Sequence, residues 1–130
     1  MKRIGLLGCG AIGTQIALAI DSGKIPATLT HVYDVKRSQA DNLVSKLKLK
    51  PEVVANSHLL SSNPIDLVVE AASQDAVRKD AVSILQNKKD LMIMSAGALL
   101  DQSVFEVISD ACKDFGKTVY LPSGAIAGLD

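Results

Sequence analysis

Short apolar runs alternate along the chain with longer segments in which apolar residues recur at the three- and four-residue spacing of a helix. The short runs predict strands. In most of them polar residues do not alternate with apolar ones, which indicates a strand that is buried on both faces. The predicted strands cover residues 4–7, 29–33, 53–55, 65–71, 91–94 and 118–121. Repeated strand–helix–strand units of this kind are typical of an α/β fold with a parallel sheet.

The helical segments end at recognisable signals. Pro51 ends the second segment, Gly116 is placed to cap the last one, and Asn63 and Pro64 form a turn before the strongest strand. The predicted helical segments are residues 12–22, 40–47, a short turn at 58–62, 77–85 and 104–115. With about six strands and four or five helices, we predict an α/β protein with a doubly wound parallel sheet that forms one domain over residues 1–130.

Composition narrows the class of partner. Fourteen basic and fourteen acidic residues cancel, which gives no electrostatic basis for binding nucleic acid or an anionic membrane. No apolar run approaches the length of a membrane span, and the first residues do not resemble a signal peptide, so we expect a cytoplasmic protein. Cys9 and Cys112 fall in different predicted elements, so we expect neither a disulfide nor a metal site.

A glycine-rich turn follows the first predicted strand. Gly8, Gly10 and Gly13 have the G-x-G-x-x-G spacing, and Ala11 and Ile12 open the helix that follows. Such a turn lets the backbone approach a pyrophosphate, which the amides and the dipole of the helix N-terminus favour. The spacing alone is weak evidence, but its place between a strand and a helix predicts a Rossmann dinucleotide-binding fold.

Asp34 ends the second predicted strand, about 20 residues after Gly13, where such folds place an acidic residue. A carboxylate there would accept hydrogen bonds from the adenosine ribose and repel a 2′-phosphate, which favours NAD. Lys36 and Arg37 follow closely enough to bind a 2′-phosphate, so NADP is the alternative. The structural alternative for Asp34 is a cap of the next helix.

Small residues follow the fourth, fifth and sixth strands, whose carboxyl ends should face the nicotinamide. Small residues after strands are also ordinary turn chemistry, so this signal is weak by itself. The candidate cofactor-binding residues in these loops are Ala72, Ser73, Ser95, Ala96, Gly97 and Ala125.

Four segments together resemble the L-aspartate dehydrogenase family. They are Gly-Cys-Gly-Ala-Ile-Gly at 8–13, Val-Val-Glu-Ala-Ala-Ser-Gln at 68–74, Met-Ser-Ala-Gly-Ala-Leu at 94–99 and Tyr-Leu-Pro-Ser-Gly-Ala-Ile-Ala-Gly-Leu-Asp at 120–130. The resemblance covers essentially the whole chain but only about the first half of a typical member. It implies that Ala125, with Ser123 and Gly124, lies beside the nicotinamide, and Ala127 departs from the glycine of many members.

The resemblance implies oxidation of L-aspartate to iminoaspartate and then oxaloacetate, with NAD or NADP as oxidant, feeding NAD biosynthesis. It places the catalytic residues in a second domain, so we expect this chain alone to be inactive and the full-length protein to be a homo-oligomer. One alternative is the cofactor domain of a homoserine dehydrogenase, a dihydrodipicolinate reductase or a sugar-oxidising Rossmann enzyme. The other is a stand-alone nucleotide-sensing module without catalysis.

No residue of the chain is predicted to be catalytic. His31 falls within a strand, and His58 is interpreted as part of a polar loop away from the site. Cys9 occupies a variable position of the glycine-rich turn, and Cys112 is expected to pack within a helix. Glu70 ends the central strand, where it either supports the site as a polar residue or belongs to ordinary strand-end structure.

Overall fold

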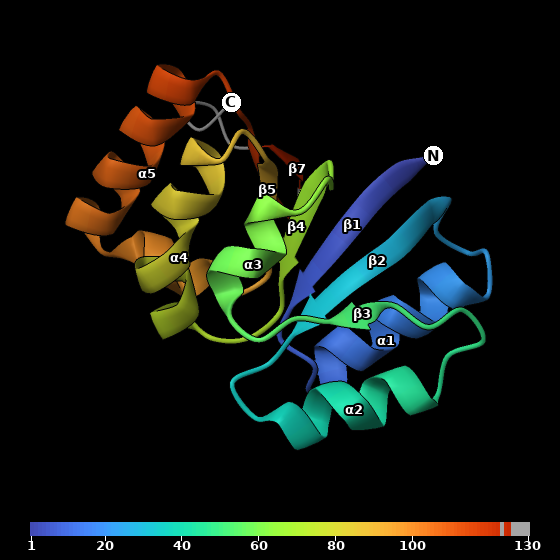
Figure 1. Cartoon of the computed structure of the whole chain (residues 1–130). Coiled ribbons are helices and arrows are strands. Elements are labelled where there is room, and N and C mark those ends of the chain that lie inside the picture. The colour runs from blue at the N-terminus through green and yellow to red at the C-terminus, as the bar shows by residue number, and fades with distance from the viewer. Residues whose placement is uncertain (123, 126–130) are drawn as a thin grey trace.

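A computed structural model describes residues 1–122, 124 and 125, whose strands form one sheet in the order β3-β2-β1-β4-β5-β6-β7 (Figure 1). Strands β1 to β6 pair in parallel, and the short β7 pairs antiparallel with β6. The strands are β1 Lys2–Leu7, β2 Ala27–Tyr33, β3 Glu52–Val53, β4 Leu67–Glu70, β5 Asp90–Ile93, β6 Val119–Leu121 and β7 Gly124–Ala125. The predicted doubly wound parallel sheet is confirmed, and its order reverses between β1 and β4.

Helices cover both faces of the sheet. In Figure 1, α1 and α2 lie on one face and α3, α4 and α5 on the other. The helices are α1 Ala11–Asp21, α2 Arg37–Ser45, α3 Ser57–Ser62, α4 Gln74–Gln86, the 3-10 helix η1 Ala96–Leu100 and α5 Gln102–Phe115. No helix of the described part of the chain is both long and apolar enough to cross a membrane.

Each face of the sheet has its own hydrophobic core. Leu6 and Val69 belong to the cluster that includes α1 and α2, whereas Leu7 and Val68 belong to the cluster that includes α4 and α5. Successive residues of a strand point to opposite faces, so a strand covered on both sides is apolar throughout. Because the strands are buried on both faces, they can be predicted from the sequence as short apolar runs.

The structure corrects several predicted boundaries. The third strand is only Glu52–Val53 and not residues 53–55, and the fourth begins at Leu67 instead of residue 65. The short helical turn predicted at residues 58–62 is confirmed as α3, so His58 lies in a helix and not in a polar loop. The sequence interpretation missed η1, because five residues with two alanines and a glycine carry no helical periodicity, and it missed the two-residue β7.

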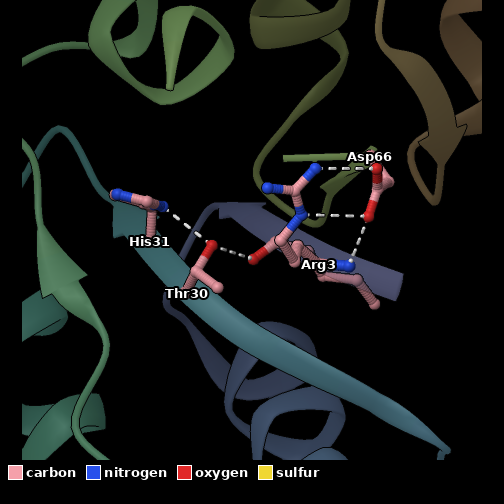
Figure 2. Close-up of polar contacts among 5 residues, drawn as sticks. Arg3, Thr30, His31 and Asp66 are labelled. Atoms are coloured by element: carbon pink, nitrogen blue, oxygen red, sulfur yellow. Dashed lines mark hydrogen bonds and ion pairs between the residues drawn. The ribbon is translucent and has the colours of Figure 1, made fainter. Parts of the chain in front are cut away.

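The amino-terminal part of the sheet is held by polar contacts between strands (Figure 2). Asp66, just before β4, accepts hydrogen bonds from the Arg3 amide at 2.8 Å and from the Arg3 guanidinium at 3.3 Å. The Thr30 hydroxyl donates to the Ile4 carbonyl at 3.3 Å, and His31 Nδ1 lies 2.8 Å from the same hydroxyl. His31 therefore acts as a sheet residue, as predicted.

Candidate cofactor-binding site

The glycine-rich turn has a separate steric reason for each glycine. Gly8 has φ of +106°, and a Cβ there would lie 2.6 Å from the carbonyl carbon of Ala71. A Cβ at Gly13 would collide with the carbonyl oxygen of Gly8, so α1 can pack against the turn only with glycine at this position. A Cβ at Gly10 would meet only Gln39 Oε1, at 3.9 Å, so the backbone of Gly10 faces open space.

Gly10 is also the N-cap residue of α1, and no described side chain caps this helix. Ala11 and Ile12 occupy the first turn and are exposed, with Ile12 52% exposed, whereas Gly13 is buried. The first-turn amides of a helix have no partner within the helix and carry a partial positive charge. The turn therefore presents main-chain donors that an anionic group such as a pyrophosphate can bind.

Asp34 joins the glycine-rich turn to the loop after β2. Its Oδ2 accepts a hydrogen bond from the Cys9 amide at 2.8 Å, and its Oδ1 accepts one from the Lys36 amide at 2.8 Å. The N-cap residue of α2 is Lys36, and no side chain caps that helix, so Asp34 is not a helix cap. A carboxylate has about four acceptor positions, which leaves Asp34 able to accept from a ligand as well.

A cavity of about 440 Å³ lies at the carboxyl ends of β1, β2 and β4, where the strand order reverses. Its walls come from the glycine-rich turn, the loop after β2, the loop after β4 and one face of α4. The lining residues are Leu7, Gly8, Gly10, Tyr33, Asp34, Val35, Lys36, Gln39, Ala71, Ala72, Ser73, Asp75, Ala76, Lys79 and Asp80. A cavity of this volume is within the usual range for small ligands.

Five of the predicted site residues line this cavity. They are Gly8, Gly10, Asp34, Ala72 and Ser73. Sequence reasoning missed the wall contributed by α4, which includes Ala76, Lys79 and Asp80. Their spacing after Ser73, at three, six and seven residues, puts them on one helical face, and this signal could have found them.

The other predicted residues lie elsewhere. Ala11 lines a smaller adjoining hollow of about 280 Å³ together with Cys9 and Gly10. Ser95 precedes η1, Ala96 and Gly97 lie within it, and Ala125 pairs with Tyr120 in β7. Ser95, Ala96 and Gly97 are not among the described residues that line the main cavity. Ser123 and Ala127, which the resemblance singled out, lie outside the described residues.

Glu70 ties the loop after β4 to the loop after β5. Its carboxylate accepts hydrogen bonds from the amides of Ala72 at 2.8 Å, Met94 at 3.1 Å and Ser95 at 2.9 Å. It also accepts one from the Ser95 hydroxyl at 2.7 Å. Glu70 is 1% exposed and is part of the structure at the end of β4, where it joins these two loops. Its support of the cofactor site stays a prediction.

Neither cysteine is placed for chemistry. Cys9 is buried, and its burial, followed by the charge of Asp34, raises the pKa of the thiol to about 12. A thiol with this pKa is protonated at neutral pH and is a poor nucleophile. Cys112 is packed in α5, as predicted. Within the described ranges, no group of three or more histidine, cysteine or acidic side chains could hold a metal ion.

These features fit a dinucleotide. The open backbone at Gly10 leaves room for a phosphate beside the helix N-terminus, and Asp34 stands where an adenosine ribose would be bound. Fold and cavity together define the chain as a Rossmann dinucleotide-binding domain. Residues 8–122 match the family described as homoserine dehydrogenase, NAD binding domain, and the chain belongs to this family of NAD-binding domains.

Curated relatives resemble the chain over its whole length. It is 71% identical over 130 residues to an L-aspartate dehydrogenase of Nitrosopumilus maritimus, covering 100% of this chain and 48% of the relative. It is 45% identical over 130 residues to an L-aspartate dehydrogenase of Methanocella arvoryzae, covering 47% of that protein. The resemblance noted from the four segments is therefore confirmed, and the chain spans about half the length of these relatives.

Solved structures agree on the fold. A probable dehydrogenase from Thermotoga maritima matches with a TM-score of 0.80 and 21% identity, covering 92% of this chain and 35% of that one. An apo scyllo-inositol dehydrogenase from Lactobacillus casei matches with a TM-score of 0.82 and 19% identity, covering 94% and 36% of the two chains. At these identities the similarity establishes the Rossmann fold alone.

Proposed function

We propose that this chain is the cofactor-binding half of an L-aspartate dehydrogenase. The observation that carries the proposal is the 71% identity to the Nitrosopumilus maritimus enzyme over all 130 residues of this chain. Because the chain covers 48% of that relative, the proposal assigns residues 1–130 to the dinucleotide-binding domain and the catalytic residues to a second domain outside it.

The proposal gives each part of the site a binding role. Gly8, Gly10 and Gly13, with the first-turn residues Ala11 and Ile12, would hold the pyrophosphate at the N-terminus of α1. Asp34 would accept hydrogen bonds from the adenosine ribose. The residues proposed to lie along the nicotinamide half are Ala72, Ser73, Ser95, Ala96, Gly97 and Ala125.

NAD is the cofactor that Asp34 favours, because its carboxylate would repel a 2′-phosphate. Two lysines modify that preference: Lys36, in the loop after β2, and Lys79, in α4, line the same cavity as Asp34. Neither makes an ion pair within the described part of the chain. We therefore propose that the domain binds NAD more tightly than NADP and still accepts NADP.

The proposed reaction transfers a hydride from Cα of L-aspartate to the cofactor. The amine becomes an imine, a proton is released, and water converts iminoaspartate to oxaloacetate and ammonia, unless the imine is used to build the ring of NAD. When bound, NAD supplies the hydride acceptor. The role of this chain is to bind the cofactor, fix its orientation and keep bulk water from one side of the site.

The test joins residues 1–130 to the second half of the Nitrosopumilus maritimus enzyme and measures aspartate-dependent reduction of NAD. The chain alone is expected to bind NAD without turnover, and the chimera is expected to turn over. A Gly10→Ala chimera is the matched control, because its Cβ would enter the phosphate cradle without disturbing the fold. A folded chimera that binds NAD and leaves aspartate unoxidised would contradict the proposal.

The same assay separates the alternatives. Activity of the full-length protein on L-homoserine instead of L-aspartate would favour the substrate in the family's name. Tight binding of a nucleotide by the chain, with no dehydrogenase activity in any longer form, would favour a sensing module. A cytoplasmic location and assembly of the full-length protein into a homo-oligomer remain predictions, which fractionation and light scattering would test.

A further inference from the structure

We propose that Glu70 is a positioning residue for the nicotinamide half of the cofactor site. This inference rests on the proposed function. The two loops that Glu70 joins are those after β4 and β5, which carry Ala72, Ser95 and their neighbours. Glu70 does not line the main cavity, so it would act through these loops without touching the cofactor.

The hydrogen bonds around Glu70 require a carboxylate. Three of its partners are backbone amides, which can only donate, and they reach both oxygens: Met94 and Ser95 approach Oε1, and Ala72 approaches Oε2. A glutamine of the same shape would turn an NH₂ group toward at least one of these amides, placing donor against donor in a site that is 1% exposed.

Ser95 uses both of its hydrogen-bond donors on Glu70. Its amide and its hydroxyl both donate to Glu70, at 2.9 Å and 2.7 Å. These two donors hold the start of η1 in place. That Ser95, Ala96 and Gly97 contact the cofactor stays a prediction.

A second contact joins the same two loops. A Cβ at Gly97 would collide with the side-chain amide of Gln74, so the first residue of α4 packs directly against η1. Ser73, one residue earlier, caps α4 by accepting a hydrogen bond from the Ala76 amide at 3.1 Å. Through Glu70 and through Gln74, the loops after β4 and β5 are joined into one unit.

This unit lies across the sheet from Asp34. In the strand order β3-β2-β1-β4-β5, Asp34 follows β2 and the Glu70 unit spans β4 and β5, on the two sides of the point where the order reverses. The two carboxylates therefore divide the site: Asp34 serves the adenosine half and Glu70 the nicotinamide half. ADP-ribose, which lacks the nicotinamide, and NADH, which has it, are the probes that separate these halves.

The experiment measures the affinity of the chain for NADH and for ADP-ribose by calorimetry, together with the emission of bound NADH, in Glu70→Gln. The expected result is a loss of roughly tenfold or more for NADH, because the loops after β4 and β5 would no longer be held in the geometry that the nicotinamide half requires, and less than about threefold for ADP-ribose. The emission of the bound nicotinamide is expected to shift toward that of the free ligand. Ser95→Ala is expected to change both readouts in the same direction by less.

Glu106→Gln is the matched control, since Glu106 is exposed on α5 and accepts a hydrogen bond only from Gln102 among the contacts described. Equal losses for the two ligands, or no loss for either, would overturn the inference. If Glu70→Gln does not fold, Ser95→Ala decides by the same ratio of affinities. Failure of the unmodified chain to bind either ligand would instead overturn the proposed function.

Discussion

The two ends of the parallel sheet use carboxylates in different ways. At the amino end, Asp66 bonds to a single residue, Arg3, through the Arg3 backbone amide and through an ion pair whose side chains are 37% exposed for Asp66 and 49% exposed for Arg3 (Figure 2). At the carboxyl end, Asp34 accepts hydrogen bonds from two backbone amides, and the buried Glu70 accepts from three. An exposed ion pair is screened by water and contributes little to stability, whereas bonds to backbone amides fix the path of a loop.

This difference indicates that the loops at the carboxyl end of the sheet carry the binding function of the domain. Loops at the carboxyl end have no strand partners of their own, so acidic side chains supply the acceptors that hold them. At the amino end, Asp66 and Asp90 each accept a backbone hydrogen bond from the start of a neighbouring strand, and no predicted cofactor residue lies there. Substitutions at the carboxyl end should therefore change ligand binding, and those at the amino end should change stability slightly and binding not at all.

Gly8→Ala is expected to have the largest effect. Its Cβ would lie 2.6 Å from the Ala71 carbonyl carbon and 2.7 Å from the Ala72 amide nitrogen, at a φ of +106°. The free energy of unfolding should fall by roughly 3 kcal/mol, as measured by chemical denaturation. Gly23→Ala is the control: Gly23 has φ of +83° and no atom within 4 Å, so it should cost only about 1 kcal/mol. Equal losses would mean that the close approach to Ala71 is unimportant.

Asp34→Ala should weaken NAD binding by tenfold or more. The change removes the acceptor for the Cys9 and Lys36 amides. It also removes the group proposed to bind the ribose. Each hydrogen bond to a charged group contributes about 1.5–3 kcal/mol. Calorimetric titration with NAD measures the loss. Asp41→Ala removes an exposed acid of α2 that pairs with Arg37, and it should leave the affinity unchanged. Similar losses in both variants would argue against a specific role for Asp34.

Replacing Lys36 or Lys79 by alanine should weaken NADP binding by about two- to fivefold and leave NAD binding nearly unchanged. Both lysines line the cavity beside Asp34, and exposed charge pairs contribute about 0.2–1 kcal/mol. The loss should shrink as salt is added, because salt screens exposed charges. Lys113→Ala, at an exposed position of α5, is the control. A lysine substitution that weakens both cofactors equally would place its role outside the 2′-phosphate.

Asp66→Asn is expected to have the smallest effect: slightly lower thermal stability at neutral pH and unchanged NAD affinity. Hydrogen bonds from the Arg3 side chain, and then from its backbone amide, hold the pKa of Asp66 at about 2, below its ordinary value of 3.8. The stabilisation is therefore present above pH 3.8 and is lost as the pH falls through about 2.

Thermal melts of Asp66→Asn across this acidic range provide the check. The difference from the unmodified chain should be present at neutral pH and disappear toward pH 2. Asp110→Asn, at an exposed position of α5, should show no such pH dependence. A difference that persists at pH 2, or a change in NAD affinity, would contradict the contrast between the two ends of the sheet.

The sequence predicted the fold well because double burial makes the strands apolar throughout, as with Val68 and Val69. It also predicted the glycine-rich turn and Asp34, since both depend on local geometry between consecutive elements. The predicted cap at Gly116 is of the same local kind: Gly116 has φ of +64° and ends α5.

What the sequence could not resolve depends on contacts between segments distant along the chain. Glu70 and Ser95 are far apart in sequence and meet only because β4 and β5 are neighbours in the sheet. Lys79 lines the cavity only because α4 and the loop after β2 border the same space in the folded chain. The sequence also does not predict the packing of Gly97 against Gln74, because a glycine in a sequence does not indicate which residue lies next to it in the fold.

Calorimetric titration of the chain with NAD, alongside Gly10→Ala, tests the central claim most directly. The account predicts that the unmodified chain binds NAD and that Gly10→Ala loses binding while keeping its melting temperature, because its Cβ would meet only Gln39 Oε1 at 3.9 Å in the folded chain. Unchanged NAD affinity in a folded Gly10→Ala variant, or no binding by the unmodified chain, would contradict it. In that case the glycine-rich turn would be a structural feature and not a cofactor site.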